Sequence, residues 1–373
     1  MKVLVVTAAT NSIPRFRIDM IDEFVARGCD VAVLGDEPEK RWRSFFEEHG
    51  VRYRSYPVAR NGMNPAQDMC TKRALEALFR EEAPDAIFTY QAKPNIYGCL
   101  AAHAAGVADV YVMMGGLGSV FHASGVKNTV LRSIVSLQYR AALAHAKAVF
   151  FQNEEDVALF ERLGIMGRSK AVMVRGSGVN LKKFPCKKLP GRKAFLFVGR
   201  LVRGKGVLDY LDAARMVKKD RPDVDFHLVG PFDSNPTALQ PSDLQPYIDD
   251  GTVLYHGEQA PADIAAFLEK ASVFVLPSYY GEGTPKSALE AMATGRALIV
   301  ADAVGCREVV REGVNGFLVP PKNPAALADV MRRSIDDDTS MHAMAAQSRR
   351  MAEEIFDVDK VNGTICATMG IER

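Results

Sequence analysis

Short apolar runs alternate with amphipathic helical patterns along almost the whole chain of 373 residues. Each run has the length of one strand and is rich in β-branched side chains, as in VLVVTA at residues 3–8. Runs that are apolar throughout are typical of strands buried on both faces, and strands separated by helices pair in parallel. The rhythm therefore predicts an α/β protein whose parallel sheets are covered by helices on both sides.

The rhythm is interrupted once, at residues 176–192, where Gly, Pro and Lys are frequent. A chain of this length is too long for one ordinary core, so we expect a linker here between two doubly wound, Rossmann-like domains. Such domains bind ligands at the carboxyl edges of their sheets, which places a ligand in the cleft between them. The expected strands are residues 3–8, 30–34, 51–58, 86–90, 110–114, 148–152 and 170–175, then 194–198, 225–229, 253–256, 273–276, 297–301 and 317–319.

Composition narrows the class of protein. The hydrophobic and charged contents, 48% and 25%, are ordinary for a globular protein, and a net charge of +2 gives no reason to expect nucleic-acid binding. The six cysteines are scattered without any C-x-x-C pair, which favours reduced thiols in the cytoplasm over a structural zinc. No apolar run is long enough for a membrane span.

Residues 273–295, VFVLPSYYGEGTPKSALEAMATG, carry the strongest functional signal. The pattern predicts a buried strand, a glycine loop and a helix with Thr284 as its N-cap, Pro285 at its first position and Gly295 just beyond its end. A strand leading through glycine into a helix presents free N–H groups to an anion. Glu282 and Glu290 bracket the helix start. If this spacing were isolated, Glu282 would be a solvated loop residue, and Lys286 and Glu290 an exposed ion pair.

EGTPKSALEAMATG, residues 282–295, resembles almost position by position the signature of retaining glycosyltransferases of family 4, which have the GT-B fold of two Rossmann-like domains. The resemblance implies that Glu282 accepts hydrogen bonds from the donor sugar and that Glu290 binds the ribose. The residues implied to contact the donor are Gly230, Gly283, Thr284, Pro285 and Glu290.

VGRLVRGKG, residues 198–206, lies between an expected strand and an expected helix. It mimics a phosphate-binding P-loop, but Gly206 stands where that loop needs Ser or Thr to hold magnesium. Arg200 and Lys205 can instead clamp a diphosphate, with solvated surface charges as the alternative. The segment resembles the GR…KG element of family 4, so Glu282, Arg200 and Lys205 are the expected catalytic residues. The two D-x-D pairs, at 223–225 and 357–359, lie at turns, so we expect neither a metal nor a cofactor.

The first domain is expected to bind the acceptor. KPNIYG at 93–98 and GGLGSVF at 115–121 resemble a branch of family 4 that acts on sugars carried by polyprenyl diphosphate, including N-acetylgalactosaminyltransferases. Where many members have a histidine near the donor sugar, this chain has Gly115-Gly116. The candidate acceptor residues, in loops after expected strands, are Asn11, Arg15, Arg17, Lys93, Asn95 and Gly116.

Residues 127–147 form an expected helix with Lys127, Arg132, Arg140 and Lys147 and without acidic residues. A basic amphipathic helix can lie in the interface of a bilayer, and packing on the domain's own sheet is the competing explanation. A lipid-linked acceptor favours peripheral contact with the inner face of the cytoplasmic membrane.

The resemblance thus implies a retaining glycosyltransferase that moves a sugar from a UDP-sugar, such as UDP-GalNAc or a related hexose, to a lipid-linked sugar. It implies an acceptor domain at 1–176, rejoined by 356–373, and a donor domain at 177–355. Two alternatives stay open: a nucleotide-sugar 2-epimerase of the same fold, and a non-catalytic protein that binds sugar nucleotides.

Overall fold

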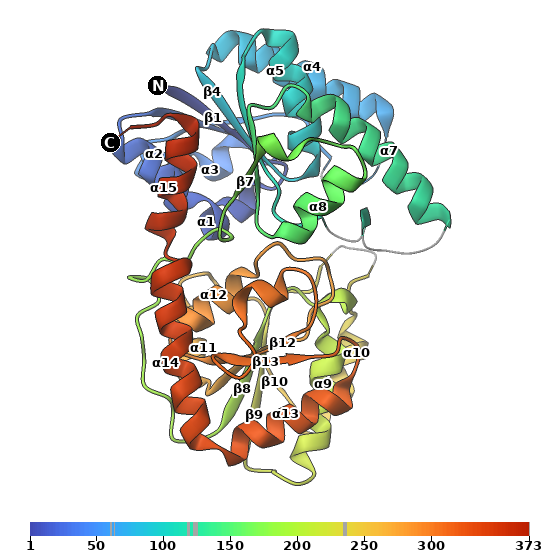
Figure 1. Cartoon of the computed structure of the whole chain (residues 1–373), viewed down its shortest axis with the longest axis vertical. Coiled ribbons are helices and arrows are strands. Elements are labelled where there is room, and N and C mark those ends of the chain that lie inside the picture. Colours follow the sequence, from blue (N-terminus) through green and yellow to red (C-terminus); the bar gives the residue numbers. More distant parts are fainter. Residues whose placement is uncertain (60–61, 63, 118–119, 122–125, 234–236, 373) are drawn as a thin grey trace. The chain divides into compact units, whose positions relative to one another are not determined.

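A computed structural model describes residues 1–59, 62, 64–117, 120–121, 126–233 and 237–372 (Figure 1). The side chains of residues 126 and 127 lie outside this description, as do His122 and Gly118. The chain forms two compact units. Unit 1 comprises Met1–Ser177 and Val361–Arg373, and unit 2 comprises Gly178–Lys360.

Unit 1 contains a seven-stranded, fully parallel sheet in the order β3-β2-β1-β4-β5-β6-β7. Its strands are β1 (Lys2–Val6), β2 (Asp30–Gly35), β3 (Arg52–Ser55), β4 (Ala86–Tyr90), β5 (Asp109–Met113), β6 (Ala148–Phe151) and β7 (Ala171–Met173). Its longer helices are α2 (Ile18–Ala26), α3 (Glu39–Glu48), α4 (Pro65–Glu82), α5 (Cys99–Ala105), α7 (Val126–Leu143) and α8 (Glu154–Arg162), and a 3₁₀ turn, η3 (Arg168–Lys170), precedes β7.

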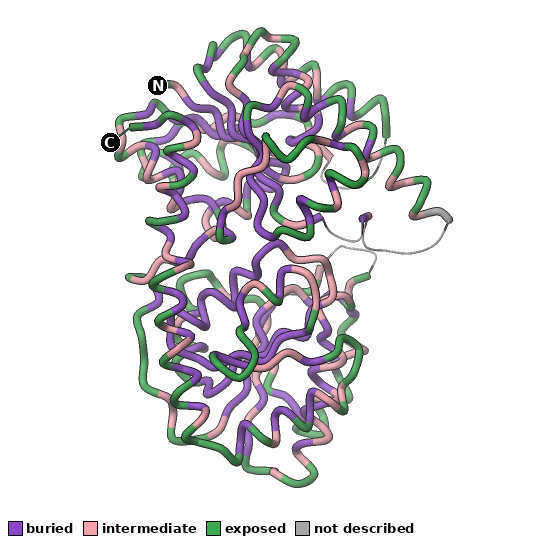
Figure 2. Tube along the Cα trace, in the orientation of Figure 1, coloured by how far each residue is buried: buried purple, intermediate pink, exposed green. Residues whose placement is uncertain are grey.

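Alternate residues of β1 belong to two different cores. Val3 and Val5 pack in one hydrophobic cluster, whereas Leu4 and Val6 pack in another, and all four are completely buried. Because successive side chains of a strand point to opposite faces, this division places one core on each side of the sheet. The strands accordingly form the buried centre of the unit in Figure 2.

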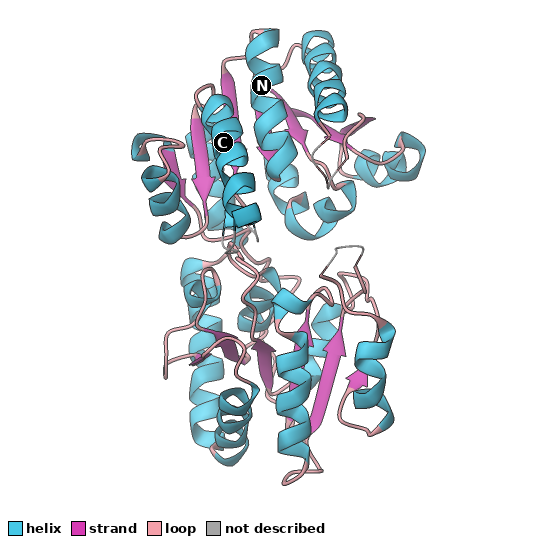
Figure 3. Cartoon of the chain, turned by 90° about the vertical axis from the view of Figure 1, so that its right-hand side faces the viewer, coloured by secondary structure: helices cyan, strands magenta, loops and turns pink. Residues whose placement is uncertain are grey.

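Unit 2 repeats the plan with a six-stranded parallel sheet in the order β10-β9-β8-β11-β12-β13 (Figure 3). Its strands are β8 (Ala194–Val198), β9 (Asp225–Val229), β10 (Leu254–Tyr255), β11 (Val273–Leu276), β12 (Ala297–Ala301) and β13 (Gly316–Val319). Its helices are α9 (Val207–Lys218), α10 (Pro241–Asp249), α11 (Ile264–Lys270), α12 (Lys286–Ala293), α13 (Pro324–Asp336) and α14 (Asp338–Ile355), with 3₁₀ turns at η4 (Arg203–Lys205) and η5 (Cys306–Val309).

The fold class expected from the sequence is confirmed, and every expected strand is present. Strand β3 ends earlier than predicted because Pro57 lacks an N–H group and cannot donate a hydrogen bond to the neighbouring strand. Most of the segment expected as a linker belongs to unit 2, and its first residues are packed, whereas many of residues 182–192 are exposed. Val179 is completely buried, and its N–H donates to the Phe356 carbonyl at 2.7 Å.

The last helix, α15 (Val358–Met369), starts in unit 2, and the chain from Val361 onward belongs to unit 1. There Ile365 and Cys366 are completely buried among side chains of α2 and β1. None of the helices in the described part of the chain has the length and apolar character that crossing a bilayer requires.

Candidate functional site

Close backbone packing brings together the loops that follow β8, β9 and β11 at the carboxyl edge of the unit 2 sheet. Gly206 has a φ of +71°, and a Cβ atom there would lie 2.2 Å from the Pro277 carbonyl oxygen. A Cβ atom at Gly230 would lie 1.8 Å from the Gly199 carbonyl oxygen. Only glycine fits at these two positions, which explains why residue 206 is not the Ser or Thr of a P-loop.

Lys205 and Glu282 form an ion pair across these loops, and each side chain is 13% exposed. Ser278 Oγ donates to Glu282 Oε1 at 2.8 Å. Burial alone would raise the pKa of Glu282, but the charge and hydrogen bond of Lys205 outweigh it and hold the pKa below its usual value. The carboxylate is therefore ionised at neutral pH, and the solvated-loop alternative for Glu282 is wrong.

Arg200 lies at the same edge and is also paired. Its guanidinium donates to Asp233 Oδ2 at 2.7 Å and lies 5.5 Å from the centre of the Tyr280 ring. Burial would lower the pKa of Arg200, but Asp233 and Tyr280 raise it above the usual value. Arg200 and Lys205 are thus not free surface charges. Each of the two cations expected to hold a diphosphate is already neutralised by a carboxylate of the same unit.

The helix after this loop begins later than predicted. α12 starts at Lys286, with Pro285 as its N-cap in an extended conformation and without a side-chain capping bond. The prediction of Thr284 as N-cap and Pro285 as first helical residue is wrong, because Thr284 and Pro285 continue the buried loop. Gly295 does follow the helix end with a φ of +77°, as predicted.

Burial of α12 also rules out an exposed Lys286–Glu290 pair. Glu290 is 3% exposed and Lys286 8% exposed, and Lys286 Nζ donates to the Gly178 carbonyl at 2.7 Å. Glu290 is thus a buried carboxylate on the helix that follows the glycine loop. Its predicted role, binding the ribose, stays a prediction.

In unit 1 the segment after β1 is helical rather than a loop. It forms a 3₁₀ turn, η1 (Thr10–Ser12), and a short helix, α1 (Ile13–Phe16). Asn11 is exposed, Arg15 is half-buried, and Arg17 is 4% exposed and stands just before α2. These three candidates therefore differ strongly in accessibility, which the sequence pattern did not indicate.

The segment after β4 is also helical. Gln91 adopts a φ of +77°, and residues Pro94–Gly98 form a π-helix turn, η2. π-Helical turns are rare and often occur at functional sites. Lys93 forms an ion pair with Asp68 at 2.6 Å. Asn95 is 1% exposed, accepting from Thr89 Oγ1 and donating to the Met113 carbonyl, so it ties β4 to β5.

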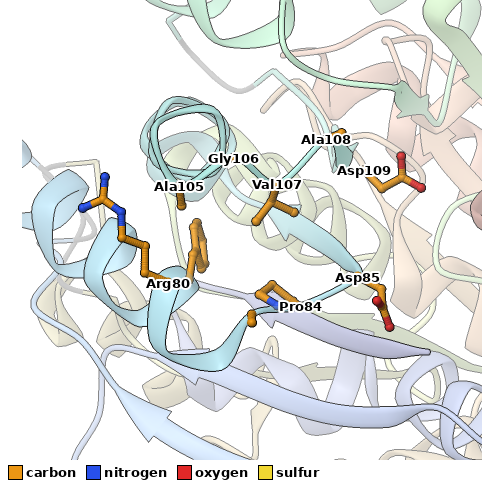
Figure 4. Close-up of a pocket in the computed structure, with 10 residues that line it drawn as sticks. Arg80, Pro84, Asp85, Ala105, Gly106, Val107, Ala108 and Asp109 are labelled. Atoms are coloured by element: carbon orange, nitrogen blue, oxygen red, sulfur yellow. The ribbon is translucent and has the colours of Figure 1, made fainter.

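Gly116 follows β5 with a φ of +104°, a conformation that favours glycine. Unit 1 also contains a cavity of about 430 Å³ (Figure 4), which the named residues do not line. Two of its lining residues are Asp85, which directly precedes β4, and Asp109, which is the first residue of β5. This cavity therefore lies at the amino edge of the sheet, opposite to the edge at which Tyr90 and Gln91 lie.

The basic helix α7 ends at Leu143, earlier than predicted, and Lys147 lies beyond it in an ion pair with Asp109 at 2.8 Å. Three large apolar side chains on α7 are exposed: Val130 by 56%, Ile134 by 45% and Leu137 by 66%. A cavity of about 370 Å³ lies beside them and is lined by Arg132, Ser133, Ser136, Leu137, Arg140 and Leu163. Packing on the sheet therefore does not account for the whole helix surface.

Ser278, Asp233 and Tyr280 belong to the site, but the sequence did not reveal them. Ser278 could have been found, since it ends the apolar run four residues before Glu282. No local pattern marks Asp233. Asp225, in the first D-x-D pair, is bound to Arg192 at 2.8 Å, and no cluster of three metal-ligating side chains occurs among the described residues.

Comparison with known protein families gives two matches. A model described as "Glycosyl transferases group 1" matches residues 192–337, and one described as "Glycosyl transferase 4-like domain" matches residues 18–176. Together they span most of both units.

Two characterised relatives are similar over most of their length. A Campylobacter jejuni N,N'-diacetylbacillosaminyl-diphospho-undecaprenol alpha-1,3-N-acetylgalactosaminyltransferase is 28% identical over 91% of this chain and 90% of its own. An Escherichia coli UDP-Gal:alpha-D-GlcNAc-diphosphoundecaprenol alpha-1,3-galactosyltransferase is 26% identical over 84% and 82%.

Solved structures show the same fold. The sucrose-phosphate synthase of Thermosynechococcus elongatus superposes with a TM-score of 0.81 at 19% identity, covering 98% of both chains. Anabaena HepE in complex with UDP and glucose superposes with a TM-score of 0.77 at 19% identity, covering 99% of both. The chain therefore belongs to the group 1 glycosyltransferases, family GT4, and is a glycosyltransferase with the GT-B fold.

Proposed function

We propose that the protein transfers a sugar from a UDP-sugar, such as UDP-GalNAc or a related hexose, to a sugar carried on polyprenyl diphosphate, with retention of configuration. The names of the two bacterial relatives, both of which describe undecaprenol-linked acceptors, support this choice of acceptor. The observation that carries the proposal is the cluster of Arg200, Lys205 and Glu282, all partly buried, with the fully buried Ser278 at the carboxyl edge of the unit 2 sheet.

In the proposed reaction the bond between the donor sugar and the diphosphate breaks while an acceptor hydroxyl attacks the same carbon. Arg200 and Lys205 stabilise the negative charge that develops on the departing diphosphate. Glu282 accepts hydrogen bonds from hydroxyls of the donor sugar, with the backbone of Gly283–Pro285 beside it, and Glu290 binds the ribose. The acceptor proton leaves with the diphosphate, so neither a covalent nucleophile nor a metal is required.

The proposed contact with the membrane is made by α7. Val130, Ile134 and Leu137 supply apolar surface, and Arg132 and Arg140 supply positive charge beside it. This combination is typical of helices that lie in the interface of an anionic bilayer. We therefore place the protein in the cytoplasm, bound peripherally to the inner face of the membrane.

A panel of nucleotide sugars, each incubated with a membrane-extracted lipid acceptor, tests this function. We expect one UDP-sugar to give a lipid-linked product and free UDP, with the anomeric configuration of the donor preserved in the NMR spectrum. Conversion of the donor sugar without acceptor would instead identify a 2-epimerase. Tight donor binding without turnover on any acceptor would identify a sugar-nucleotide-binding protein.

A further inference from the structure

Arg17 is a buried cation without a hydrogen-bonding partner in the described chain. It is 4% exposed, and its Nε atom has no hydrogen-bond acceptor. No carboxylate of the described residues forms an ion pair with it, whereas Lys93, whose side chain is 11% exposed, pairs with Asp68 at 2.6 Å. Its nearest electrostatic neighbour is Tyr90, whose ring centre lies 5.3 Å from the guanidinium carbon.

Such an arrangement is costly for the folded protein. Burial lowers the pKa of Arg17 to about 10, and the group still carries its charge at neutral pH. A cation–π contact only partly replaces the hydration that a guanidinium loses on burial. A side chain that reduces stability in this way, with neither an ion pair nor a hydrogen bond in the described chain, is expected to serve binding.

The surroundings of Arg17 are held in place by polar contacts. Gln91 Oε1 accepts from the Ala8 N–H at 2.8 Å and from Thr7 Oγ1 at 3.0 Å, while Ser12 Oγ lies 3.0 Å from the Tyr90 hydroxyl. These bonds connect the segment after β1 to the end of β4. Arg17 therefore lies at the carboxyl edge of the unit 1 sheet, where doubly wound sheets bind ligands.

We infer that Arg17 binds a phosphate oxygen of the lipid-linked acceptor, namely of its polyprenyl diphosphate. The inference rests on the proposed function, which supplies two anionic substrates. The diphosphate of the donor is assigned to Arg200 and Lys205 of unit 2, so the diphosphate of the carrier is the partner left for Arg17. A planar guanidinium suits this group because it can donate two parallel hydrogen bonds to one phosphate.

Calorimetry on the full chain tests the inference with geranyl diphosphate, a short polyprenyl diphosphate, and with UDP. Arg17→Met keeps most of the apolar side chain and removes the charge, and Arg17→Lys keeps the charge without the planar fork. We expect Arg17→Met to weaken geranyl diphosphate at least tenfold, Arg17→Lys to weaken it less, and both to leave UDP affinity within about twofold. Arg43→Met, at an exposed arginine of α3, is the matched control and should change neither affinity.

Thermal unfolding separates binding from a structural role. Because Arg17→Met removes an unpaired buried charge, its melting temperature should equal or exceed that of the wild type. A lower melting temperature with unchanged geranyl diphosphate affinity would show that Arg17 only supports the fold. A loss of UDP affinity instead would assign Arg17 to the donor and overturn the inference.

Failure of the proposed function gives a different result. If no lipid-linked sugar is elongated, yet geranyl diphosphate binds in an Arg17-dependent way, the proposed reaction is wrong, but the proposed binding of diphosphate by Arg17 is confirmed. If the wild type and Arg17→Met turn over a lipid-linked sugar with the same acceptor KM, the proposed reaction is confirmed and the proposed binding of diphosphate by Arg17 is wrong.

Discussion

Lys205 and Glu282 are joined by an ion pair inside unit 2, although they lie in separate loops, after β8 and β11. Each is expected to contact a different part of the donor, the diphosphate and the sugar. A diphosphate that takes Lys205 releases the Glu282 carboxylate, which then needs hydrogen-bond donors besides Ser278 because only 13% of its side chain is exposed. The sugar hydroxyls are suitable donors. The ion pair would thereby couple recognition of the two halves of the substrate.

This coupling predicts opposite effects of one substitution. Glu282→Gln removes the competitor for Lys205, so UDP should bind at least as tightly as to the wild type. The same variant should lower kcat/KM for the UDP-sugar by about ten- to a hundredfold, since a charge-assisted contact to the sugar is lost. Calorimetry with UDP and initial rates measure the two effects. Weaker binding of UDP would show that Glu282 does not restrain Lys205.

Glu290 should behave differently from Glu282. Glu290→Ala should weaken UDP itself by about tenfold or more, because the predicted contact is to the ribose and not to the transferred sugar. Glu290 is 3% exposed, so Glu290→Gln, which preserves the volume, serves as the second variant, and thermal unfolding monitors the fold. Equal UDP affinity of the Glu282 and Glu290 variants would contradict this division of roles.

Because Arg200 and Asp233 form an ion pair, substitutions of these two residues should have opposite effects on the use of the donor. Arg200→Ala should reduce kcat/KM by about ten- to a hundredfold through loss of a phosphate contact. Asp233→Asn frees the Arg200 guanidinium from its 2.7 Å ion pair and should tighten UDP binding a few-fold. Arg203→Ala is the control, since Arg203 is 54% exposed and pairs with Asp243. If Asp233→Asn instead lowers affinity, Asp233 positions Arg200 and does not compete with the donor.

Turnover should survive a chelator. The described residues contain no cluster of three metal-ligating side chains, and fixed cations lie at the site expected to bind the diphosphate. Rates measured in EDTA should therefore equal those in its absence. Loss of turnover in EDTA that Mg2+ or Mn2+ restores would contradict this expectation.

Charge reversal on α7 tests the membrane contact. Arg132→Glu combined with Arg140→Glu should reduce flotation with anionic liposomes, while activity on a short-chain soluble acceptor persists. The matched control reverses Lys40 and Arg43, exposed cations on α3. Unchanged flotation of the α7 variant would leave the exposed Val130, Ile134 and Leu137 without a membrane role.

The sequence by itself determined the fold class and the positions of the strands along the chain, but not their order within each sheet. Runs such as AFLFV at β8 and ALIVA at β12 are buried along their whole length, and a short run that is apolar at every position and lies between helical patterns is typical of a strand covered on both faces. It also singled out Glu282, Arg200 and Lys205, because the glycine loops around them form a local motif with fixed spacing.

Only the tertiary structure decided which side chains meet. Asp233 neutralises Arg200 and Ser278 binds Glu282 through contacts between loops that follow different strands, and no local spacing encodes such contacts. The same holds for burial in unit 1, where neighbouring candidates diverge. Asn11 is exposed, whereas Arg17 is buried against Tyr90, because the segment after β1 coils into helical turns instead of remaining extended. Burial and partners depend on the packing of distant segments, which periodicity along the chain does not describe.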